Sequence, residues 1–146
     1  MSGAIEKVVG RNELGHTGSH QAGIVIPKAQ QIIEFFPALD ASEFNPRKLI
    51  HFWNEATQRY WPLNYIYYNG KIHGFSTRNE YRLTGITQLF RLIDIDAGDL
   101  LSFVNGAHGY EIAVKKSLVS TDDFSRGRIA LSFSGDWFYE ETEQES

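Results

Sequence analysis

The chain has 146 residues, of which 42% are apolar and 22% charged, values typical of one soluble globular domain. It contains no cysteine, which excludes disulfides, thiolate metal sites and cysteine nucleophiles. No apolar run approaches the roughly 18 residues of a membrane span. Met1–Gly10 also lacks the apolar core of a secretory signal, so we expect a cytoplasmic protein that does not bind membranes.

The formal net charge of −4 arises at the C-terminal end, where Glu140, Glu141, Glu143 and Glu145 lie close together. Without these four, the acidic residues equal the 14 lysines and arginines in number. The net charge therefore does not exclude DNA binding, because phosphate attraction is local and screened beyond about 8–10 Å. We predict one domain over residues 1–139 and an acidic, disordered tail over residues 140–146.

Short strands are predicted from the start of the chain. Ile5–Arg11 is the first, and the polar, glycine-rich stretch Asn12–Gln21 is expected to be an exposed loop. Gly23–Ile26 is a β-branched strand. Apolar residues at helical spacing predict a helix over Lys28–Phe36, which Pro37 ends.

The middle of the chain predicts another strand and a hairpin. Lys48–Glu55 is the strand. Tyr65–Tyr68 and Lys71–Phe75 flank Asn69-Gly70, the pair of residues preferred in a two-residue hairpin turn. We therefore expect these two segments to pair with each other.

The last third predicts a short helix at Thr87–Leu92 and a second hairpin. The hairpin joins Leu100–Val104 to Tyr110–Lys116 through Asn105–Gly109, and Arg128–Ser134 is the final strand. Many short strands with few helices favour an antiparallel barrel, which hides strand edges. The predicted fold is mainly β, with about seven strands and one or two short peripheral helices.

The segment Ser76–Arg82 carries side chains suited to the major groove. Arginine can donate two hydrogen bonds to guanine, asparagine can pair with adenine, and glutamate can accept from cytosine. Lys71, His73 and Arg82 could contact phosphates. From these residues alone, a solvated loop with a local Arg–Glu pair worth under about 1 kcal/mol remains the simpler explanation.

A second polar stretch, Gly15–Gln21, combines flexible glycines with small donors and acceptors that can approach a base edge or a phosphate. An ordinary loop is again the simpler explanation. His16 and His20 have the spacing of a zinc pair on a helix, but the glycines argue against a helix here.

No catalytic motif is present in the sequence. There is no Glu-x-Lys or Asp-x-Lys triplet of the metal-dependent nucleases, and no nucleophile elbow or phosphate-binding glycine loop. We interpret Asp94, Asp96 and Asp99 as turn residues. The larger aromatic residues are assigned to the core and the barrel rim.

Three blocks of sequence together resemble the N-terminal, effector-DNA-binding domain of EcoRII-type restriction endonucleases. They are Thr17–Pro27, Ile66–Asn69, and Thr77–Glu80 with Arg82, and the resemblance spans roughly residues 8 to 135. It implies an open antiparallel pseudobarrel, a fold shared with DNA-binding domains of the plant auxin-response-factor type, in which two loops act as arms that clasp the major groove.

Within this resemblance, His20 falls in the first arm, and Arg78, Glu80 and Arg82 fall in the second. Ser76 and Tyr81 stand where the family pattern has lysine, and Val25 stands where it has an aromatic residue. The resemblance therefore does not imply that the same DNA sequence is read.

We predict a sequence-specific double-stranded DNA recognition domain of a restriction endonuclease, with no cofactor and no nuclease centre of its own. A nuclease domain would be covalently linked in the parent protein. The residues expected to contact DNA lie in the two arms or are nearby cations: His16, Thr17, Ser19, His20, Gln21, Lys28, Lys71, His73, Ser76, Arg78, Asn79, Glu80, Tyr81, Arg82 and Arg91.

Two alternatives from other classes remain open. One is a small metal-dependent or ligand-binding β-barrel protein that uses His16, His20 and His73. The other is a barrel that binds proteins through exposed aromatic residues.

Overall fold

The computed structural model describes residues 3–10, 23–116, 130–133 and 137–141, and these form nine strands and two short helices. The elements in chain order are β1 (Gly3–Val8), β2 (Ile24–Ile26), α1 (Gln30–Ile33), β3 (Arg47–Asn54), β4 (Arg59–Tyr68), β5 (Glu80–Thr84), α2 (Thr87–Leu92), β6 (Leu100–Gly106), β7 (Gly109–Lys115), β8 (Ala130–Phe133) and β9 (Trp137–Glu141).

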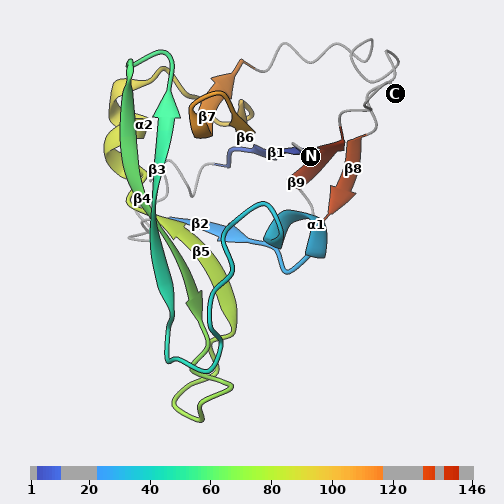
Figure 1. Ribbon diagram of the computed structural model, residues 1–146. Coiled ribbons are helices and arrows are strands. Elements are labelled where there is room, and N and C mark those ends of the chain that lie inside the picture. Colours follow the sequence, from blue (N-terminus) through green and yellow to red (C-terminus); the bar gives the residue numbers. More distant parts are fainter. Residues whose placement is uncertain (1–2, 11–22, 117–129, 134–136, 142–146) are drawn as a thin grey trace.

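All nine described strands belong to one sheet, in the order β2-β5-β4-β3-β7-β6-β1-β9-β8. Neighbouring strands are antiparallel except β3 and β7, which are parallel where Trp53 lies beside Glu111. Figure 1 shows that the sheet curls, so that β3, β4 and β5 face β1, β8 and β9 across the interior. The mainly β, open-pseudobarrel prediction is confirmed, with nine described strands in place of about seven.

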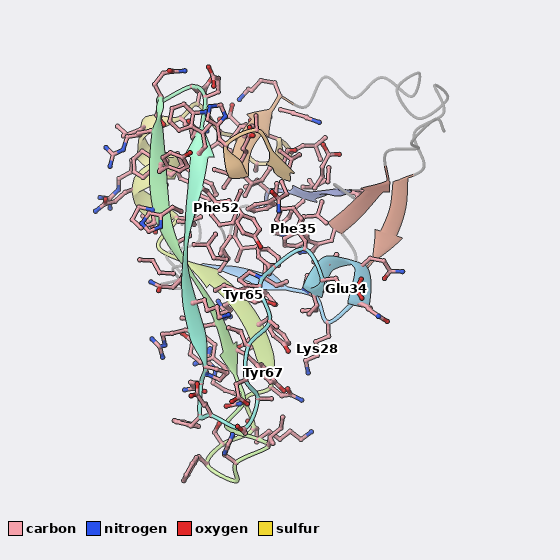
Figure 2. All side chains as sticks on the ribbon, in the orientation of Figure 1. Lys28, Glu34, Phe35, Phe52, Tyr65 and Tyr67 are labelled. Carbon is pink, nitrogen blue, oxygen red and sulfur yellow. The ribbon has the colours of Figure 1, made fainter. Side chains whose placement is uncertain are left out.

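The core lies on the inner face of the curled sheet. Strands β3 and β4 alternate buried and exposed residues because successive side chains point to opposite faces. Figure 2 shows Phe35, Phe52 and Tyr65 between this part of the sheet and α1. The Tyr65 ring stacks on Phe36 with centroids 4.5 Å apart. Aromatic burial of this kind dominates core energetics, and truncating a fully buried phenylalanine typically costs about 3–5 kcal/mol.

The first helix is shorter than the sequence predicts. α1 spans Gln30–Ile33, and only i→i+3 hydrogen bonds, from Phe35 N–H to Ile32 O and from Phe36 N–H to Ile33 O, continue the turn. No side chain caps the helix at Ala29, and Pro37 stops it, so little favours a longer α-helix. The second predicted helix, Thr87–Leu92, is confirmed.

The hairpin predicted around Asn69-Gly70 is wrong. Strand β4 pairs with β5, in a register that places Tyr68 opposite Glu80, and Lys71–Phe75 forms turns instead of a strand. Hydrogen bonds from His73 N–H to Asn69 O and from Phe75 N–H to Gly70 O close these turns locally. Residues 69–79, called the distal loop below, form the lower end of the molecule in Figure 1.

The second hairpin is confirmed, with β6 and β7 paired as far as Gly106 and Gly109. The predicted final strand corresponds to β8, and β9 follows it and pairs with both β1 and β8. Strand β9 includes Glu140 and Glu141, so it extends two residues into the predicted tail. Residues 142–146 of that tail lie outside the described residues.

Candidate nucleic-acid interface

On the outer face of β2, β5, β4 and β3 the strand register aligns a row of side chains, of which Val25 and Arg47 are exposed and Ile66 is buried. Val25 lies opposite Arg82, Arg82 opposite Ile66, and Ile66 opposite Arg47. Leu83 and Tyr81 of β5 pack on the core, which leaves Glu80 and Arg82 on the outer face. The sequence did not identify Arg47 as part of this surface, because only the register brings it level with Arg82.

Two arginines flank one carboxylate on this face. Arg78 Nη2 lies 2.9 Å from Glu80 Oε1, and Arg82 Nε lies 3.4 Å from Glu80 Oε2. The Arg78 guanidinium carbon also lies 3.9 Å from the Tyr68 ring centroid, a cation–π contact. The Arg78 side chain remains 49% exposed, whereas the Arg82 side chain is only 11% exposed.

The electrostatics of Glu80 reflect this position. Burial alone would raise its pKa, but the hydrogen bond from Arg78 and the charge of Arg82 hold the pKa below its ordinary value. The carboxylate is therefore ionised at neutral pH and fixes the orientation of both guanidinium groups. The local Arg–Glu pair is present, and the cluster keeps an excess of positive charge.

Two other members of the predicted second arm are tied to the protein. The Asn79 side-chain oxygen accepts a hydrogen bond from the Tyr67 hydroxyl at 2.6 Å. That bond uses one of the two acceptor sites of the amide oxygen and restricts the orientation of the side chain. Tyr81 stacks on Tyr67 with centroids 4.3 Å apart, on the side of β5 opposite Glu80 and Arg82.

The distal loop is anchored by a buried asparagine. The Asn69 side-chain oxygen accepts from the Asn45 backbone N–H at 2.8 Å, and its Nδ2 donates to Ala41 O and Glu43 O. A Cβ on Gly70 would overlap Ser76 Oγ, so any larger residue there would require the Ser76 hydroxyl to move. Ser76 Oγ also accepts from the Arg78 backbone N–H, which gives this predicted contact residue a structural role.

The predicted phosphate contacts are dispersed. Lys71 is exposed on the distal loop, and the His73 ring nitrogen Nε2 lies 3.2 Å from Ala41 O. Lys28, which is exposed, lies between β2 and α1 and projects below α1 in Figure 2. Arg91 lies in α2, at the other end of the molecule from the distal loop in Figure 1. The structure therefore does not bring Arg91 together with the others.

The predicted first arm falls on residues 11–22, so His16, Thr17, Ser19, His20 and Gln21 lie outside the described residues. Its attachment at Gly23 is described. Gly23 has φ +144°, and a Cβ there would lie 3.0 Å from both Leu83 O and Thr84 Cγ2. The chain can approach β5 this closely only without a side chain.

The two predicted arms join the β2–β5 pair at opposite ends. Gly23 precedes Ile24, which lies opposite Leu83, whereas Asn79 precedes the other end of β5. At about 3.4 Å per residue, the distance along β5 between Leu83 and Asn79 is about 14 Å. The major groove of B-DNA is about 12 Å wide.

The acidic cluster at residues 94–99 is a turn, as predicted. Asp99 Oδ2 accepts from the Asp96 backbone N–H at 2.8 Å and lies 2.6 Å from Lys116 Nζ. The hydrogen bond with Asp99 raises the pKa of Lys116, which stays charged. Within the described ranges no group of three or more histidine or acidic side chains could hold a metal ion, and no helix is long and apolar enough to cross a membrane.

Three comparisons with known proteins bear on this site. A family model described as restriction endonuclease EcoRII, N-terminal, matches residues 4–122. Among solved structures, the B3 domain of the UbaLAI restriction endonuclease, crystallised with cognate DNA, has a TM-score of 0.58 and 17% sequence identity, and the match covers 95% of this chain and 86% of that chain. At this identity the likeness shows a common fold. The comparison with curated proteins found no match.

Proposed function

Since the chain belongs to the family of the N-terminal domain of restriction endonuclease EcoRII, we propose that it binds a short specific site in double-stranded DNA on behalf of a restriction endonuclease. The crystallised UbaLAI relative, which has the same fold, is a restriction endonuclease domain in complex with cognate DNA. The proposed partner is therefore a DNA duplex.

One observation carries the proposal. Two guanidinium groups share one carboxylate on the outer face of β5, and this face lies between the attachment points of the two arms. The separation of these points, about 14 Å along the strand, suits a clasp on a major groove about 12 Å wide. The first arm, around His16 to Gln21, would contact the groove from one end of β5 and the distal loop from the other.

The proposed roles of the basic residues follow from how far their side chains are exposed to solvent. Arg78 is half-exposed and is oriented by Glu80 and Tyr68, so its fork can reach O6 and N7 of a guanine with little loss of side-chain freedom. Arg82 is mostly covered and acts through Glu80 as a positioning residue. Lys71 and Lys28, both exposed, would add phosphate contacts that carry no sequence information.

Cleavage belongs, in this proposal, to a nuclease domain linked to this one in the parent protein. The Glu-x-Lys or Asp-x-Lys triplet that metal-dependent nucleases commonly carry is absent from the sequence. The domain therefore supplies recognition, and the recognition energy would direct or activate a catalytic part elsewhere.

A selection from a pool of randomised duplexes, followed by binding measurements at stated salt, tests the proposal. Arg78→Ala is expected to lose about 1–3 kcal/mol on the selected site and less on random duplexes, because a bidentate guanine contact disappears. Arg59→Ala is the matched control, since Arg59 also lies over an aromatic ring, Trp61 at 4.1 Å, but at the other end of β4.

Arg59→Ala should bind both duplexes as the wild type does. If Arg78→Ala loses the same binding free energy on selected and random duplexes, Arg78 contacts only phosphate. If no duplex is enriched even at low salt, the proposed function is wrong.

A further inference from the structure

Large apolar side chains are exposed together at the end of the distal loop. Phe75 is 72% exposed, Ile72 59% and Phe44 52%, although Phe44 comes from the segment before β3. The Phe44 and Phe75 rings meet edge to face with centroids 5.0 Å apart, and Phe44 also contacts the His73 ring. We call Phe44, Ile72 and Phe75 the apolar tip.

The apolar tip is held in place by the protein. The Lys71 N–H donates to Arg78 O at 2.9 Å and closes a neck, beyond which Ile72–Thr77 form the end of the loop. Asn69, fully buried beneath the neck, ties the loop to the segment that carries Phe44. Exposed side chains on such an ordered support can be recognised with little further loss of conformational entropy.

The surroundings of the tip favour DNA as its occupant. Residues 69–79 contain Lys71, His73 and Arg78 and no acidic residue, although Glu43 lies in the supporting segment. Arg78, the residue proposed to read a guanine, forms the neck itself. Three side chains also make a patch far smaller than the roughly 800 Å² per partner of a stable protein interface.

The major groove offers such a patch one apolar group. Among the base edges exposed there, thymine alone carries a methyl group, at C5, and the other groups are hydrogen-bond donors or acceptors. We propose that the apolar tip contacts the 5-methyl group of a thymine next to the base pair that Arg78 reads, and so determines specificity at that position. This inference rests on the proposed function above.

Replacement of thymine by deoxyuracil, one position at a time in the selected duplex, removes only the methyl group. The wild type is expected to lose about fourfold in affinity at one or two positions, equivalent to about 0.8 kcal/mol for one buried methyl group. Phe75→Ala and Ile72→Ala are the test variants. Because both side chains are exposed, these variants should keep the wild-type thermal unfolding midpoint.

At the sensitive position, at least one of the two variants should bind thymine and deoxyuracil duplexes equally well. Leu92→Ala is the matched control, because Leu92 is an equally exposed apolar residue, 64%, on α2. It should retain the full discrimination.

Two results would overturn the inference while leaving the proposed function intact: no position at which deoxyuracil weakens binding, or the same fourfold loss in the wild type and in both tip variants. A chain that binds no duplex at all would overturn the proposed function as well.

Discussion

Two polar turns of this chain, the distal loop at residues 69–79 and the acidic turn at residues 94–99, are held by different kinds of bond. In the acidic turn, Lys116 Nζ lies within 3.7 Å of the carboxylates of Asp94, Asp96 and Asp99, and the charges are used within the protein. In the distal loop, neutral hydrogen bonds of buried Asn69 provide the anchor.

This difference decides what each turn can do. In a turn that is closed by ion pairs, the charged groups are already paired within the protein. Here three aspartates surround one lysine, and the excess of negative charge would repel phosphates. A loop anchored by an uncharged amide leaves Lys71 exposed, and Arg78, although it pairs with Glu80, keeps half of its side chain exposed. The kind of internal bond therefore separates a structural turn from a candidate binding loop.

The largest expected effect comes from removing the neutral anchor. Asn69→Ala leaves the Asn45 N–H and the oxygens of Ala41 and Glu43 without this partner, and should lower the free energy of unfolding by about 3 kcal/mol. Urea denaturation measures this, and DNA affinity should fall too. Asn105→Ala, at an exposed residue of β6, is the control and should change neither quantity. A stable Asn69→Ala variant would mean that the loop needs no anchor.

A smaller effect, on stability alone, is expected in the acidic turn. Asp99→Ala removes the buried acceptor of the Asp96 N–H and a partner of Lys116, and should lower the free energy of unfolding by about 2 kcal/mol. DNA affinity should not change. Asp94→Ala, where the side chain is 90% exposed, should cost less than about 0.5 kcal/mol. Weaker DNA binding by Asp99→Ala would show that the acidic turn also contributes to DNA binding.

The smallest effect concerns Glu80, the acid between the two arginines. Because its folded-state pKa is lowered, its ion pairs stabilise the loop at pH values above its ordinary pKa of 4.5 and are lost as the pH falls through the lowered pKa. The contribution should stay under about 1 kcal/mol, since Arg78 is half-exposed. A carbon-13 NMR titration should place the Glu80 pKa below 4.5, and Arg78→Ala should raise it. A wild-type midpoint above 4.5 would indicate that burial outweighs the arginines.

The local sequence pattern was sufficient to predict those elements whose hydrogen-bonded partners are also close in the sequence. The β6–β7 hairpin and α2 form close to their predicted bounds, because their hydrogen bonds join residues no more than about 15 positions apart. The family blocks were equally visible, and they indicated the fold and the second arm. The polar segment Glu80–Thr84 carried no strand signal, however, and it becomes β5 because it pairs with both β2 and β4.

The sequence by itself determined a small β domain, a segment at Arg78–Arg82 whose side chains can hydrogen-bond to bases, and family motifs in the expected order and spacing. Tertiary structure decided how that segment is presented. The Asn69-Gly70 pair predicted a tight turn, but Asn69 bonds instead to Asn45 and its neighbours, 24 positions earlier, and the turn opens into the distal loop. The row from Val25 to Arg47 likewise exists only through strand register. A buried amide takes whichever partners folding brings within reach, and no local pattern in the sequence specifies which partners those are.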